Sequence, residues 1–128
     1  MKILLTGGTG GIGSAILKEL SGDQKAEGVF LCANNHEQAK QLEASNPRLR
    51  GIQCRLEDEG ELKRLSEELL SYEYNVLINN AFDRLQLKRF AELPWDEFQK
   101  KIDIGVRSAF VLSQMATRAM KQKGRNRD

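Results

Sequence analysis

Glycines gather in one short segment near the start of the chain, where they fit the binding of a phosphate group. The segment runs from Thr6 to Gly13 and reads TGGTGGIG. It follows an apolar stretch typical of a buried strand and precedes a helical pattern that begins at Ile12. Glycines permit a tight turn and a close approach of the backbone to a ligand, and the N-terminus of a helix attracts negative charge. The segment therefore predicts a site for the pyrophosphate of a dinucleotide.

Three glycine spacings overlap within this segment, and spacing alone does not choose among them. They are Gly8-x-Gly10-x-x-Gly13, Gly7-x-x-Gly10-x-x-Gly13 and Gly7-x-x-x-Gly11-x-Gly13. The order of strand, turn and helix is the context that a nucleotide-binding turn requires. A turn with a purely structural role is the alternative.

Alternating strand and helix patterns position this turn. Short apolar runs predict strands over residues 2–6, 28–33, 51–56 and 75–79. Helical patterns follow them over residues 12–20, 37–43, 62–70 and 95–121. Parallel neighbours need a crossover connection, so this alternation is typical of a parallel sheet covered by helices on both faces. We expect an α/β fold in a single domain that spans residues 1–128.

Three segments resemble the short-chain dehydrogenase/reductase family. The glycine segment is similar to the TGxxxGIG motif of that family, and the letters NNA at residues 79–81 are similar to its Asn-Asn-Ala-Gly motif. Residues 95–120, which include VRSAFVLSQ, resemble its long fourth-helix region. The resemblance covers nearly the whole chain. It implies a Rossmann-like sheet with strand order 3-2-1-4 and an NAD(P)-dependent oxidoreductase whose cofactor lies between strands one and four.

The resemblance also implies which residues would hold the dinucleotide. Three glycines and one isoleucine would line the pyrophosphate, namely Gly7, Gly11, Gly13 and Ile12, and Thr6 would stiffen the turn by hydrogen bonding. Asn79 and Ala81 would lie beside the adenosine ribose, and Leu56 would touch the adenine ring. The full set of implied cofactor-binding residues is Thr6, Gly7, Thr9, Gly10, Gly11, Ile12, Gly13, Ala33, Asn34, Asn35, Leu56, Asn79, Asn80 and Ala81.

One position departs from the family at the adenine end. Family members commonly carry an aspartate directly before the position of Leu56, where it pairs with the adenine amino group. This chain has Arg55 there. Adenine recognition is therefore either shifted to Glu57 or Asp58 or weakened, and both carboxylates are also ordinary residues for the start of a helix.

The end of the second strand bears on the choice of cofactor. An acidic residue there accepts hydrogen bonds from the ribose of NAD and repels a 2′-phosphate. This chain has Ala33, Asn34 and Asn35 instead. We therefore favour NADP over NAD, although Gly10 stands where NADP users of the family often place an arginine.

The catalytic groups of the family have no match in this chain. The chemistry of the family resembles a proton relay through a tyrosine, a lysine four residues later and a serine. Here Tyr72 and Tyr74 are followed at that spacing by Val76 and Ile78. We assign no catalytic residue, and we expect Lys88, Lys100 and Lys101 to be solvated helix charges.

Two further departures concern the expected nicotinamide side of the cleft. Phe82 replaces the glycine of the Asn-Asn-Ala-Gly motif, and Gly105 stands where the family usually has a catalytic asparagine. The sequence also stops where the fifth strand of the family would begin. We interpret the chain as the nucleotide-binding half of such an enzyme, truncated before that strand.

The last predicted helix carries apolar residues on more than one face. Phe98, Val106 and Leu112 follow one stripe, and Ile104 and Val111 lie off it. We therefore expect a homo-oligomer through the helix at 95–121. The alternative function is a non-catalytic nucleotide-binding or oligomerisation module that pairs with another chain.

Composition excludes several other classes of function. The chain is 40% hydrophobic and 30% charged, its net charge is +2, and the basic excess lies in residues 121–128, which we expect to be a frayed tail. Interleaved charges argue against nucleic-acid binding. No apolar run suits a membrane span or a signal peptide, so we expect a cytoplasmic protein. Two cysteines and one histidine predict reduced thiols and no metal site.

Overall fold

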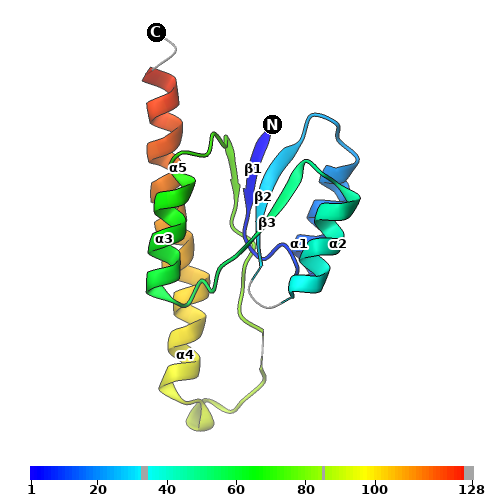
Figure 1. Ribbon diagram of the computed structural model, residues 1–128. Coiled ribbons are helices and arrows are strands. Elements are labelled where there is room, and N and C mark those ends of the chain that lie inside the picture. Colours follow the sequence, from blue (N-terminus) through cyan, green and yellow to red (C-terminus); the bar gives the residue numbers. More distant parts are fainter. Residues whose placement is uncertain (33–34, 85, 126–128) are drawn as a thin grey trace.

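Four parallel strands form the centre of the computed structural model, which describes residues 1–32, 35–84 and 86–125 (Figure 1). The strands are β1 (Lys2–Leu5), β2 (Glu27–Cys32), β3 (Leu49–Gln53) and β4 (Val76–Ile78). Their order is β3-β2-β1-β4, and each neighbouring pair is parallel, which confirms the predicted order. Within the described ranges, no strand pairs with the outer edge of β4.

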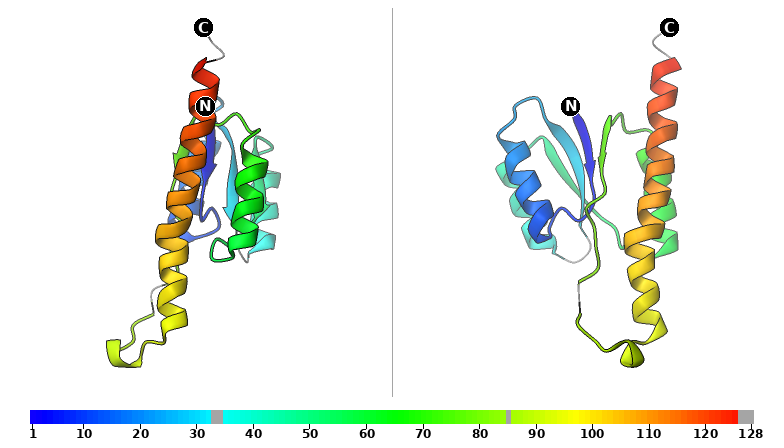
Figure 2. Two further views of the ribbon diagram at one scale, coloured as in Figure 1. Left: turned by 90° about the vertical axis from the view of Figure 1, so that its left-hand side faces the viewer. Right: turned by 180° about the vertical axis from the view of Figure 1, so that it is seen from behind.

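Helices cover both faces of this sheet. They are α1 (Gly11–Ser21), α2 (His36–Ser45), α3 (Glu59–Leu69), α4 (Trp95–Ile102) and α5 (Ser108–Arg125). Helices α1 and α2 lie on one face, and α3 and α5 lie on the other (Figure 1). A π-helical turn, Asp103–Arg107, joins α4 to α5, so the two continue as one long helix that reaches beyond the sheet (Figure 2).

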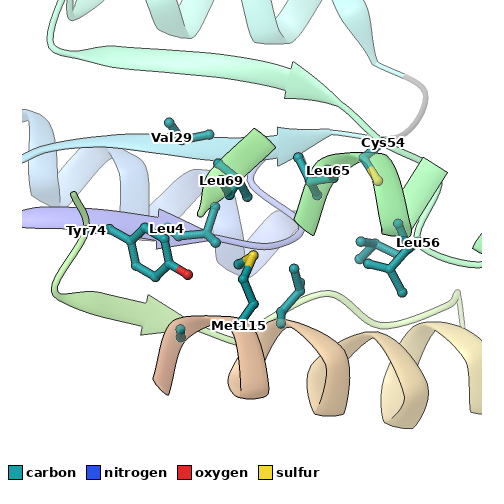
Figure 3. Packing of buried hydrophobic residues seen from close by; sticks show 11 residues of the cluster. Leu4, Val29, Cys54, Leu56, Leu65, Leu69, Tyr74 and Met115 are labelled. Atoms are coloured by element: carbon teal, nitrogen blue, oxygen red, sulfur yellow. The ribbon is translucent and has the colours of Figure 1, made fainter. Parts of the chain in front are cut away.

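The two faces of the sheet bury separate clusters of side chains, because successive residues of a strand point to opposite faces. In β1, Leu4 packs in the cluster that contains Leu112 and Met115 of α5 (Figure 3). Its neighbour Leu5 packs in the cluster that contains Leu17 of α1. Both leucines of β1 are fully buried. This double burial fixes β1 in the interior of the sheet, so the turn after it lies between elements of both faces.

Several predicted boundaries differ from those of the structure, among them the start of α3, which lies at Glu59 and not at residue 62. The helix expected over 95–121 contains the π-helical turn and continues to Arg125, so residues 121–125 are helical and not frayed. Lys123 stabilises this end, since its Nζ lies 3.4 Å from a carboxylate oxygen of Glu73. The third strand ends at Gln53, before the predicted residue 56, and the residues that follow it lead into α3.

Candidate functional site

The turn between β1 and α1 is held by close backbone contacts that only glycine permits. Gly7 has a φ of +69°, and a Cβ on it would lie 3.0 Å from the Cα of Ala81. A Cβ on Gly13 would lie 1.9 Å from the carbonyl oxygen of Gly7. The turn therefore folds back against both its own helix and the end of β4.

Side chains also tie this turn to the residues after β4. The hydroxyl Oγ1 of Thr6 accepts hydrogen bonds from the backbone N–H groups of Asn80 and Ala81, both at 2.9 Å. The Nδ2 of Asn80 donates to the carbonyl oxygens of Thr6 at 3.1 Å and of Gly7 at 3.3 Å. Thr6 is only 2% exposed. Hydrogen bonds thus join the glycine segment and the NNA segment into one unit.

The N-terminus of α1 keeps its backbone donors free. Its N-cap residue, Gly10, makes no side-chain cap, and the first turn holds no acidic residue. In the described part of the chain, no group accepts from the N–H groups of Gly11, Ile12 or Gly13. By contrast, α2 is capped by the side chain of Asn35. Free N–H groups and the positive end of the helix dipole are suited to an anion.

A cavity of about 640 Å³ opens in front of these donors. A Cβ on Gly11 would meet no atom within 4 Å, so the backbone there is open to a ligand. The cavity is lined by predicted residues from the first turn, the start of α2, the loop after β3 and the loop after β4. These predicted residues are Gly7, Thr9, Gly10, Gly11, Ile12, Asn35, Leu56, Asn80 and Ala81.

The other predicted residues lie elsewhere. Thr6 and Gly13 do not line the cavity. Thr6 accepts the hydrogen bonds that hold the turn, and Gly13 packs against the backbone of Gly7. Asn79 donates from Nδ2 to the Oγ of Ser113 in α5 at 3.2 Å, and it is not a lining residue either. Alternation along the strand end puts Asn79 and Asn80 on opposite sides. Ala33 and Asn34 lie outside the described residues.

Of the two carboxylates predicted to recognise adenine, Glu57 and Asp58, only one lines the cavity in the described structure. Asp58 caps α3 by accepting from the N–H of Glu61 at 2.9 Å, and its carboxylate also lies 3.5 Å from Arg55. Hydrogen bonds from the backbone and side chain of Arg55 hold the pKa of Glu61 below its ordinary value. Glu57 lines the cavity instead, with its carboxylate 3.8 Å from the Nζ of Lys100.

Sequence reasoning missed several residues on the far side of the cavity. Asp83, Arg84, Lys100 and Ile104 line it, and none was among the predicted site residues. Lys101 pairs with Asp83 at 3.0 Å, with both side chains about one-fifth exposed, so it is not the solvated helix charge that we expected. The strand order could have indicated these residues. The loops at the carboxyl ends of β1 and β4 must meet where the strand order reverses, so residues after β4 should line the same cavity as the glycine turn.

Two side chains that could take part in acid–base or nucleophilic chemistry, Cys54 and Tyr74, are held in protonated forms by burial. Burial raises the pKa of the Cys54 thiol to about 11, so this cavity-lining cysteine is protonated at neutral pH. Burial likewise raises the pKa of Tyr74 to about 12. Tyr74 precedes β4, whereas the cavity lies after β4, so this phenol is at the opposite end of the sheet.

The described residues form neither a metal site nor a membrane span. No group of three or more histidine, cysteine, aspartate or glutamate side chains among them is placed to hold a metal ion. No helix in the described ranges is long and apolar enough to cross a membrane.

Comparisons with known proteins agree on one family. Residues 1–127 match the sequence model described as short chain dehydrogenase. A tropinone reductase homolog of Arabidopsis thaliana is 30% identical over 128 residues, which are 94% of this chain and 47% of the relative. A chloroplastic tropinone reductase homolog of the same plant is 32% identical over 123 residues, which are 91% of this chain and 37% of the relative.

A solved structure resembles the chain to a similar extent. The crystal structure of a short chain dehydrogenase from Burkholderia cenocepacia in complex with NADP has a TM-score of 0.81 and 27% identity. The match covers 91% of this chain and 49% of that one. The chain spans about half the length, or less, of the curated relatives that it matches.

Proposed function

The chain belongs to the short chain dehydrogenase family, and we propose that it forms the part of such an oxidoreductase that binds a nicotinamide adenine dinucleotide. The observation that carries this proposal is the uncapped N-terminus of α1, which faces the cavity. The N–H groups of Gly11 and Ile12, which line the cavity, would donate to the pyrophosphate. The open space at the Cα of Gly11 fits the close approach that this requires.

The rest of the ligand would extend to both sides of the pyrophosphate. The adenosine half would lie over the ends of β2 and β3, against Asn35 and Leu56, with Glu57 as an acceptor for the adenine amino group. The other half would lie over the end of β4, because dinucleotides bind across the point where the strand order reverses. The bound nicotinamide supplies a hydride donor or acceptor.

We further propose that NADP is preferred to NAD. The residues that the sequence places after β2 are Ala33, Asn34 and Asn35, so no carboxylate there would repel a 2′-phosphate. Asn35 lines the cavity. Its Oδ1 accepts from the N–H of Gln38 at the start of α2, and its Nδ2 donates to Oε1 of Gln38. The NADP complex of the relative from Burkholderia cenocepacia supports the same preference.

Calorimetric titration of the 128-residue chain with NADPH and with NADH tests this preference. We expect both to bind at one site, with NADPH at least about fivefold tighter, because nothing acidic opposes its additional phosphate. Adenosine 5′-monophosphate serves as the weak-binding control, since it lacks the pyrophosphate. Tighter binding of NADH would contradict the preference, and binding of neither would contradict the proposed function.

Turnover in the family requires a tyrosine, and none is among the described residues that line the cavity. Neither tyrosine of the sequence is followed by a lysine at the fourth position, and Tyr74 lies at the other end of the sheet. We propose that the chain alone binds the dinucleotide without reducing a carbonyl substrate. The acid–base groups of the reaction would then come from residues other than those of this chain.

A second candidate function is a module that assembles with another copy of itself, and exposed aromatic residues favour it. Leu112 and Met115 of α5 are buried against α3 and the sheet. Trp95, Phe98 and Phe110 are 68%, 41% and 62% exposed, so a second apolar face of α4 and α5 stays uncovered. Self-association through this face would remove it from water.

Sedimentation velocity tests this assembly. We expect the wild-type chain, whose monomer mass is 14.5 kDa, to sediment as a dimer or larger. The double variant Phe98→Glu/Phe110→Glu should sediment as a monomer, because each glutamate would have to be buried in the interface. A control substitution, Arg118→Glu, changes an exposed charge on the same long helix. A wild-type chain that stays monomeric at high concentration would exclude this function.

A further inference from the structure

One aromatic ring stands in the wall of the cavity at the end opposite to the adenine side. Phe82 follows β4 directly after the NNA segment, lines the cavity and is 68% exposed. Exposed apolar side chains are common on protein surfaces and by themselves carry no function. This ring differs because the backbone on both sides of it is anchored and the ring lies beside the π-helical turn.

The backbone on both sides of Phe82 is anchored. Before it, the N–H groups of Asn80 and Ala81 donate to Oγ1 of Thr6. After it, the carboxylate of Asp83 pairs with the Nζ of Lys101 at 3.0 Å, and the same ammonium group donates to the carbonyl oxygen of Arg84 at 3.1 Å. The segment that carries the ring is therefore tied to β1 on one side and to α4 on the other.

The ring itself rests on the π-helical turn. A Cβ on Gly105 would lie 3.7 Å from both Cδ2 and Cε2 of Phe82, which is ordinary van der Waals contact. The ring therefore lies beside the backbone of Gly105, at a spacing that would also admit a Cβ there. Turns of this π type are frequent at functional sites. One side of the ring is supported, and the remainder is open to the cavity.

A largely exposed aromatic ring on an anchored backbone favours stacking with a planar ligand ring. Phenylalanine loses little conformational freedom when a ligand covers it, and aromatic pairs are more favourable than their buried area alone predicts. Among the described residues that line the cavity, Phe82 is the one aromatic side chain, and the residues after β3 contribute the aliphatic Leu56 beside Cys54. The dinucleotide has a second planar ring on the other side of the pyrophosphate from adenine. That second ring would lie over the end of β4, where Phe82 lines the cavity.

We propose that Phe82 is a specificity-determining residue whose ring stacks on the planar ring of the ligand half that lies beyond the pyrophosphate. This inference rests on the proposed function, because it takes the pyrophosphate at the N-terminus of α1 as its point of reference. Phe82 would raise the affinity of the cavity for a dinucleotide whose second ribose carries an aromatic base. It would not raise the affinity for a nucleotide that lacks this base.

Two ligands and two matched variants test this role by calorimetry. The ligands are NADP⁺ and 2′-phospho-ADP-ribose, which lacks the nicotinamide ring. The variants are Phe82→Leu and, as the control, Phe90→Leu, whose aromatic ring is 90% exposed and does not line the cavity. Urea unfolding of both variants checks that the fold is unchanged.

Stacking predicts that Phe82→Leu weakens the binding of NADP⁺ about tenfold and leaves 2′-phospho-ADP-ribose within about twofold. Phe90→Leu should bind both ligands as the wild type does. An equal loss for both ligands, no loss for either, or tighter binding of NADP⁺ by Phe82→Leu would overturn the inference and leave the proposed function standing. Failure of the wild-type chain to bind either ligand would overturn both.

Discussion

Replacing Gly11 by aspartate is expected to weaken nucleotide binding by at least about a hundredfold while the chain remains folded. A Cβ at this position meets no atom within 4 Å, so the larger side chain fits. Its carboxylate would stand where the pyrophosphate is proposed to lie. Two unit charges about 4 Å apart repel by on the order of 4 kcal/mol at an effective dielectric constant of about 20, and each ~1.4 kcal/mol is a factor of ten in affinity.

The same substitution should raise the free energy of unfolding. An acidic residue in the first turn of a helix is stabilising by about 0.3–1 kcal/mol, and α1 has none at present. Removal of a glycine from the start of the helix adds to this effect. Loss of affinity together with gain of stability separates a damaged site from a damaged fold.

Gly11→Asn is the matched control, because asparagine has nearly the shape of aspartate and no charge. We expect it to bind nucleotide more weakly than the wild type and clearly more tightly than Gly11→Asp. Affinities come from calorimetry with NADPH, and stabilities come from thermal unfolding. Wild-type affinity in the aspartate variant would show that the pyrophosphate does not lie at this helix end.

Replacing Gly13 by alanine is expected to have the largest effect on stability. The added Cβ would lie 1.9 Å from the carbonyl oxygen and 2.8 Å from the carbonyl carbon of Gly7. These are backbone atoms, and that carbonyl oxygen is held by hydrogen bonds from Nδ2 of Asn80 and from the N–H of Gly10. Overpacking usually costs about 1–3 kcal/mol and sometimes more, so we expect about 3 kcal/mol here after the small gain in helix propensity.

Urea unfolding measures this loss as a lower midpoint at an unchanged slope. Gly124→Ala is the control, because its Cβ would meet no atom within 4 Å in α5, and alanine is favoured over glycine in a helix. The same chemical change should therefore destabilise the chain at one helical glycine and stabilise it slightly at the other. Equal midpoints for Gly13→Ala and the wild type would contradict the close approach of α1 to the turn.

The sequence predicted the parts of the fold that depend on local patterns. Buried strands read as short apolar runs, and a parallel sheet follows from their alternation with helices. The strand order, which the structure confirms, was implied by the family resemblance and not by these patterns. The glycine turn was located because its residue types are required by the backbone contacts of Gly7 and Gly13. Both features are properties of consecutive residues.

Features that depend on contacts between distant residues were not predicted. Lys101 finds its partner Asp83 across a loop, and Arg55 finds Glu61 in the next helix. Asn79 belongs to the NNA segment, yet its side chain lies against Ser113 of α5. No sequence pattern states where these elements meet. The helix end at Arg125 was missed for the same reason, because Lys123 pairs with Glu73, which precedes β4.

The most direct test of the central claim is a calorimetric titration of the 128-residue wild-type chain with NADP⁺, run beside the Gly11→Asp variant. A dinucleotide bound at the N-terminus of α1 predicts a saturable isotherm with one ligand per chain for the wild type and no measurable heat of binding for the variant at the same concentrations. Identical isotherms for the two proteins, or no binding by the folded wild type, would contradict it.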